Sequence, residues 1–142
     1  MAWHGDAAAC VDGLLQPRRI MHTTRDHRKL RVFGLADTLV VDVYRATRRF
    51  PDEERFGLQA QVRRAAVSVP TNIVEGSARI TTADYCKFLN IATASAAEAQ
   101  YLLDLSARLE MLTPTDVAPL LERYDVLLRG LKRLVFELHR RT

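Results

Sequence analysis

The residue types that most often perform catalysis or bind metals are sparse in this sequence of 142 residues, and they are not grouped. The histidines lie near the two ends of the chain, at His4, His22, His27 and His139. A di-iron helical bundle needs Glu-x-x-His pairs, and Glu137 and His139 are only two positions apart. We therefore predict no metal site and no cofactor.

The candidate nucleophiles also lack partners. Cys86 has no histidine at helical spacing, and Ser68 and Ser77 have no nucleophile-elbow context. No phosphate-binding loop of the Gly-Lys-Ser/Thr kind occurs. We expect Cys86 to be a small core residue and the protein not to be an enzyme.

Cysteine usage and hydropathy indicate the compartment. Cys10 and Cys86 lie in very different contexts, which does not indicate a disulfide framework. No apolar run approaches the roughly 18 residues of a membrane span. We predict a reducing, cytoplasmic location.

The densest polar motif is QVRRAAVSVPTNIVEG, residues 61–76. Pro70 should kink a helix here, and Asn72 and Glu75 could hydrogen-bond the backbone groups that the kink frees. Gly76 begins the exit from the helix, and Glu75 is correctly spaced for an ion pair with Arg79. We favour this structural role for Glu75 over that of a catalytic carboxylate.

Apolar residues recur at steps of three and four in four segments, which is typical of amphipathic helices. The first covers about 30–49, with Tyr44 in its core-facing stripe, and the second begins at Pro51 and its following acids. The third begins at Thr81 or Thr82, and the fourth at Thr113-Pro114. Small residues in the middle of the third predict a close approach of a neighbouring helix.

These segments predict an all-α fold, an up-down-up-down antiparallel four-helix bundle, because the links between them are short. We assign residues 27–142 to the bundle domain. Residues 1–26 have no helical period and end in several arginines, so we predict a disordered basic leader there.

The net charge of +4 is unevenly distributed between the two ends of the predicted bundle. The pole that holds the start of the first helix and the end of the fourth collects most of the unmatched Lys and Arg. Such a patch is typical of phosphate binding, although cations at a helix C-terminus also complement the helix dipole. The predicted nucleic-acid contacts are Arg28, Lys29, Arg31, Lys132, Arg133, Arg140 and Arg141, with Arg63 and Arg64, placed on the solvent side of their helix, as a second choice.

Some apolar residues lie off the core-facing stripes. They include Val41, Phe56, Val67, Val126 and Phe136. Single exposed apolar residues are ordinary, but several on different helices suggest self-association. We predict oligomer contacts at Val41, Val67, Val126 and Phe136, with scattered surface residues as the alternative.

The stretch RRAAVSVPTNIVEG, residues 63–76, resembles the signature of the four-helix bundle proteins encoded within 23S rRNA intervening sequences. Val43-Tyr44, Phe50-Pro51 and Gly57-Leu58-Gln59 are similar to the upstream pattern, and Phe88-Leu89 to the downstream one. The resemblance covers about residues 30–138. The sequence departs from the family where a Trp is usual near Phe33, glycine at Ala94 and alanine at Val74.

The resemblance implies a bundle that assembles into a ring, typically a homopentamer, with no enzymatic activity. The same fold occurs in the accessory variability determinants of diversity-generating retroelements, which bind nucleic acid and a reverse transcriptase. Two hypotheses follow for this chain. The first is a non-enzymatic oligomeric scaffold that binds RNA or DNA, and the alternative is a helical adaptor for a protein such as a reverse transcriptase.

Overall fold

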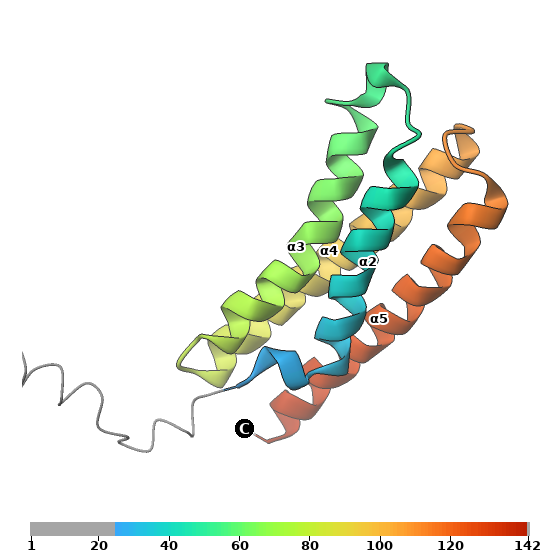
Figure 1. Cartoon of the computed structure of the whole chain (residues 1–142). Helices are drawn as coiled ribbons and strands as arrows, with labels where there is room; N and C mark the ends of the chain where they lie inside the picture. Colours follow the sequence, from blue (N-terminus) through green and yellow to red (C-terminus); the bar gives the residue numbers. More distant parts are fainter. Residues whose placement is uncertain (1–24, 142) are drawn as a thin grey trace, which may run out of the picture.

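The computed structural model describes residues 25–141, which form four long helices (Figure 1). They are α2 (Arg31–Thr47), α3 (Leu58–Ser77), α4 (Thr82–Arg108) and α5 (Pro114–Arg140). The short 3-10 helix η2 (His27–Lys29) precedes α2, and η3 (Asp52–Glu54) lies between α2 and α3. The described part of the chain contains no strand, and the predicted all-α class is confirmed.

The four helices alternate in direction along the bundle (Figure 1). α2 packs against α3 and α5, and α4 packs against the same two helices, most closely against α3. The diagonal pairs, α2 with α4 and α3 with α5, do not come into close contact. This is the antiparallel up-down-up-down bundle that the short links predicted.

Two of the predicted helix starts are confirmed by their caps. The Thr81 hydroxyl accepts a hydrogen bond of 3.1 Å from the backbone N–H of Asp84, and Thr113 accepts one of 3.1 Å from that of Asp116. Pro114 occupies the first turn of α5, where no backbone donor is needed. These caps satisfy backbone donors that a helix start leaves free.

The predicted start of the second helix at Pro51 is wrong. The acids after Pro51 form the separate turn η3, and α3 begins only at Leu58. Gly57 separates η3 from α3, because its backbone has φ −101° and ψ −116°, outside the helical region. Glu54 nevertheless supports the start of α3, because its Oε2 accepts a 2.8 Å hydrogen bond from Leu58 N.

All four helices contribute to one core, in which Leu39, Ile73, Leu89 and Leu127 are fully buried. Ala92, Ala96 and Ala99 of α4 are also buried, and α4 is the helix that packs most closely against α3. Ser68 on α3 and Ser95 on α4 approach to 2.8 Å between their hydroxyl oxygens. The predicted close approach is confirmed. Within residues 25–141, no helix combines the length and apolar composition that a membrane crossing requires.

Tyr124 is the largest fully buried side chain, and its hydroxyl has no hydrogen-bond partner among the described residues. An unsatisfied buried hydroxyl is destabilising, so we expect Tyr124→Phe to raise the free energy of unfolding by about 1 kcal/mol. Urea denaturation of the two proteins measures this difference. A loss of stability would instead show that the hydroxyl is hydrogen-bonded in the folded protein.

The same residue should affect stability at high pH. Burial raises the pKa of Tyr124 above its ordinary value of 10. Above pH 10 the unfolded chain therefore loses this proton first, and stability falls as the pH rises. Tyr124→Phe should reduce that fall, which denaturation on both sides of pH 10 would reveal.

Candidate nucleic-acid interface

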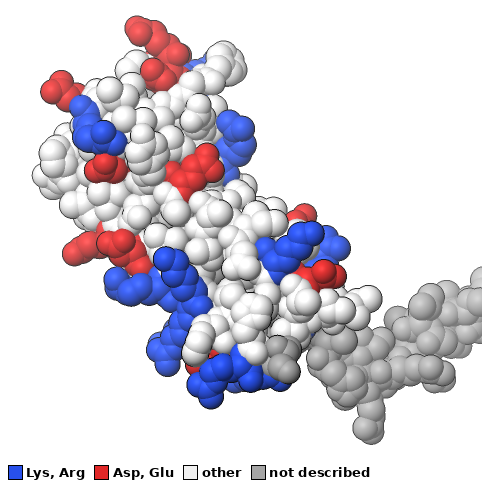
Figure 2. All heavy atoms as spheres, turned by 180° about the vertical axis from the view of Figure 1, so that it is seen from behind, with Lys and Arg blue, Asp and Glu red and all other residues white. Residues whose placement is uncertain are grey.

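Basic side chains gather at the end of the bundle formed by the start of α2, the end of α3, the start of α4 and the end of α5, here called the basic pole. Figure 2 shows the largest group of Lys and Arg at this end, whereas the opposite end carries more acids. Gly130 on α5 lies against Val32 on α2, which brings the two helices together at this end. The predicted contact residues at this pole are all exposed: Arg28, Lys29, Arg31, Lys132, Arg133, Arg140 and Arg141.

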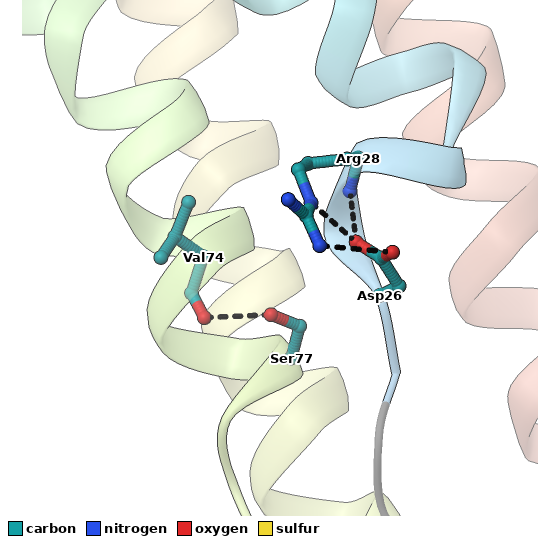
Figure 3. Close-up of polar contacts among 4 residues, drawn as sticks. All are labelled: Asp26, Arg28, Val74 and Ser77. Carbon is teal, nitrogen blue, oxygen red and sulfur yellow. Dashed lines mark hydrogen bonds and ion pairs between the residues drawn. The ribbon is translucent and has the colours of Figure 1, made fainter.

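Two of these cations are paired with carboxylates. Arg28 Nε lies 3.0 Å from Asp26 Oδ1, and Figure 3 shows the pair beside the end of α3. The hydrogen bond from the Arg28 side chain lowers the pKa of Asp26 below its usual 3.8. Arg140 lies 3.9 Å from Glu137. The other members have no ion pair within residues 25–141: Lys29, Arg31, Lys132, Arg133 and Arg141.

Arg25 and Arg79 also lie at the basic pole, but aromatic rings hold them in place. The Arg25 guanidinium lies 4.7 Å from the centroid of Tyr85 and donates a 2.7 Å hydrogen bond to the Arg79 carbonyl. The Arg79 guanidinium lies 4.4 Å from the centroid of Phe88. Arg25 and Asp26 were predicted to belong to the leader. Arg25 instead contacts the bundle, and Asp26 caps the start of η2. The rest of the predicted leader lies outside the described residues.

The predicted ion pair between Glu75 and Arg79 is wrong. α3 ends at Ser77, so Arg79 lies beyond the helix and its side chain stacks on Phe88 instead. The side chain of Glu75 is exposed and makes no hydrogen bond or ion pair within the described part of the chain. It therefore satisfies no backbone group of α3.

Asn72 contributes to packing between α3 and α4. Pro70 remains inside a continuous α3, and the carbonyl that loses its donor through Pro70 is that of Ala66. Asn72 instead donates to the carbonyl of Ser68 at 2.8 Å and to its hydroxyl at 3.0 Å. The prediction for Asn72 was therefore wrong about the acceptor. Its hydrogen bonds extend the contact between Ser68 and Ser95 on α4.

Arg63 joins α3 to the end of α2. Its Nε donates a 2.9 Å hydrogen bond to Thr47 Oγ1, and its guanidinium lies 4.5 Å from the centroid of Tyr44. The expectation that Arg63 lies on the solvent side of α3 is wrong, because these contacts half-bury it. Arg64 is exposed.

Arg63 and Arg64 line an open groove of about 650 Å³ along α2 and α3, here called the α2–α3 groove. Tyr44 also lines it and is 40% exposed, so its predicted place in the core was wrong. Sequence periodicity could not show this groove, because Phe56 lines it from the turn between η3 and α3, outside both helices.

The family model for the 23S rRNA-intervening sequence protein matches residues 28–133. The chain belongs to this family. A structural relative is a protein of unknown function from the S23 ribosomal protein family of Bacteroides thetaiotaomicron, with a TM-score of 0.68 and 23% sequence identity. The similarity covers 73% of this chain and 97% of that one, and at this identity it supports the fold alone. No protein with a curated description matches the sequence.

The predicted oligomer contacts lie on different sides of the family's bundle. Val41 on α2 is 45% exposed, and Val126 and Phe136 on α5 are 51% and 60% exposed. Val67 is half-buried and lines the α2–α3 groove. Apolar surface is therefore accessible on both α3 and α5, which lie diagonally opposite each other in the bundle.

The described residues contain no group of three or more His, Cys, Asp or Glu placed to bind a metal ion. Cys86 is buried and unpaired, and burial raises the pKa of its thiol. That environment disfavours the reactive thiolate. His4, His22 and Cys10 lie outside the described residues.

Proposed function

We propose that this member of the 23S rRNA-intervening sequence family is a non-enzymatic, oligomeric scaffold that binds RNA or DNA phosphates through the basic pole. The supporting observation is the group of exposed cations at one end of the bundle, where Figure 2 shows Lys and Arg gathered. Five of them have no ion pair within residues 25–141: Lys29, Arg31, Lys132, Arg133 and Arg141. They come from η2, the start of α2 and the end of α5. A reducing, cytoplasmic location belongs to the same proposal.

The chemistry of these cations fits a polyanion. Lys and Arg that neutralise phosphates release the counterions condensed on the nucleic acid, so affinity falls steeply as salt rises. Contacts of this kind position a protein on the backbone without reading the sequence. We expect binding with little sequence preference.

The proposed oligomer is a ring. A two-fold dimer uses the same surface on both subunits, whereas a ring joins two different surfaces. Val67 on α3 and Val126 on α5 lie on helices that do not touch each other, which suits a head-to-tail contact. Repetition of that contact closes a ring, and a pentamer is the number that we propose.

The alternative is a helical adaptor whose partner is a protein, such as a reverse transcriptase. The exposed apolar side chains of α5, Val126 and Phe136, support it because an interface core needs such groups. A pull-down after nuclease treatment should then recover a defined polypeptide. Recovery of nothing would contradict the adaptor.

Light scattering tests the scaffold proposal. We expect a mass of several subunits that increases with a short structured RNA at about 50 mM salt and loses that increase at about 200 mM salt. A monomer whose mass is unaffected by RNA at either salt concentration would contradict both parts of the proposal.

A further inference from the structure

The α2–α3 groove combines positive charge with exposed aromatic rings. Phe56 is 89% exposed and Tyr44 is 40% exposed, and both line the groove. The Arg55 guanidinium lies 5.4 Å from the centroid of Phe56, and Arg63 lies 4.5 Å from that of Tyr44. Arg25 and Arg79 at the basic pole also lie on aromatic rings, but those rings, Tyr85 and Phe88, are buried and half-buried, whereas the ring of Phe56 is exposed.

The charge of the groove is one-sided. Arg55, Arg63 and Arg64 line it, and no Asp or Glu does. Glu54 lies nearby, but its Oε2 accepts the hydrogen bond from Leu58 N at the start of α3. The groove is therefore complementary to an anionic ligand.

The aromatic rings restrict that ligand further. A base can stack on the open side of an exposed ring only if it is not already stacked within a duplex. A ligand that stacks on Phe56 must therefore have unpaired bases. A ligand that also binds the arginines beside Phe56 must carry negative charge, as a phosphate backbone does. Duplex RNA or DNA satisfies only the second requirement.

We propose that the α2–α3 groove binds single-stranded nucleic acid. Bases stack on Phe56 and Tyr44 while Arg55 and Arg64 contact the phosphates, and Arg63 holds the Tyr44 ring in place. This inference rests on the proposed function in that the ligand is a nucleic acid, but it uses a surface other than the basic pole. The strand binds at the Phe56 end of the groove, and Val67, farther along α3, is left to the ring contact. The groove runs along α3 from Phe56 to Asn72, and its Phe56 end lies about 30 Å from the basic pole at the other end of that helix.

The experiment uses the full chain and three fluorescent probes of equal length. They are an oligothymidine, a strand of abasic sites and a hairpin duplex closed by a linker without bases, each read by anisotropy at one low salt concentration. Phe56→Ala should weaken binding of the oligothymidine by about 5- to 30-fold. It should leave binding of the abasic strand and the hairpin unchanged, because neither offers a base to stack.

Tyr101→Ala is the matched control. Tyr101 is 57% exposed, and the Arg108 guanidinium lies 5.9 Å from its ring centroid, so it resembles the pairs of the groove. It lies on α4 outside the groove, and its arginine is already paired with Asp104 at 3.0 Å. We expect this variant to bind all three probes as the wild type does.

Three results would overturn the inference. The first is equal loss in Phe56→Ala and Tyr101→Ala, and the second is equal affinity of the wild type for the oligothymidine and the abasic strand. The third is a lower mass of Phe56→Ala in light scattering without nucleic acid, which would make the groove a contact with a second copy of the chain. Charge reversal at the basic pole separates the two proposals. If it leaves all binding intact while Phe56→Ala weakens the oligothymidine, the groove stands and the proposed function of the pole fails.

Discussion

The double variant Lys132→Glu and Arg133→Glu should bind a structured RNA about 10- to 100-fold more weakly than the wild type at low salt. Both side chains are exposed on α5 and have no ion pair within the described residues. Each reversal removes a phosphate contact and adds a repelling charge. The slope of log affinity against log salt should therefore become shallower by about 2, which titrations at several salt concentrations measure.

A matched control is available at the opposite end of the bundle. Arg48 and Arg49 are neighbours at the end of α2, and both are exposed. Their replacement by glutamate changes the net charge of the chain by the same amount as the pole variant does. We expect this control to retain most of its affinity, because the position of the charge matters at short range more than its total.

Stability must be measured beside binding. Exposed substitutions usually change the free energy of unfolding by no more than about 0.5 kcal/mol, so both double variants should melt close to the wild type. Equal losses of affinity in the pole variant and its control would show that RNA responds only to net charge. Retained affinity in the pole variant would place the binding surface elsewhere.

The features that the sequence predicted correctly depend on local chemistry. Thr81 and Thr113 cap their helices with side chains that reach only three residues along the chain. The apolar period of α5 likewise determines which residues face the core without reference to any other helix. The family signature then agreed with this reading, so the fold and its topology could be predicted.

Two of the failures involve contacts between distant residues. Arg79 is well spaced for Glu75, but Phe88 on the next helix offers its ring face and α3 has already ended. Arg63 looks solvent-facing on a helical wheel, yet Thr47 on α2 accepts its hydrogen bond. Periodicity orders residues around one helix and cannot show which acceptor a neighbouring helix presents.

The same limit concealed the α2–α3 groove. Its aromatic rings come from α2 and from the turn after η3, where the predicted helix start was wrong. If the helix were continuous from Pro51, the Phe56 side chain would point in a different direction. Phe56 instead lies directly before Gly57, outside α3, and is exposed.

Gly76→Ala should lower the free energy of unfolding by about 1–3 kcal/mol, although alanine is the better helix former. A Cβ at Gly76 would lie 2.9 Å from Phe88 Cβ and 3.1 Å from Tyr85 Cδ2. Phe88 Cβ is attached directly to the backbone of α4, so a rotation of its side chain cannot move it away. The two helices must separate, and they are the most closely packed pair of the bundle.

Gly34→Ala tests the same substitution without the contact. Gly34 lies inside α2, and a Cβ there would meet no atom within 4 Å. Its effect should be the helix preference alone, a gain of about 0.5–1 kcal/mol, and urea denaturation of both variants measures the difference. Opposite signs for the two variants would show that Gly76 is required by the spacing of α3 and α4. A gain of stability in both would show that these helices can move apart at little cost, and that the motif at residues 63–76 does not fix the distance between them.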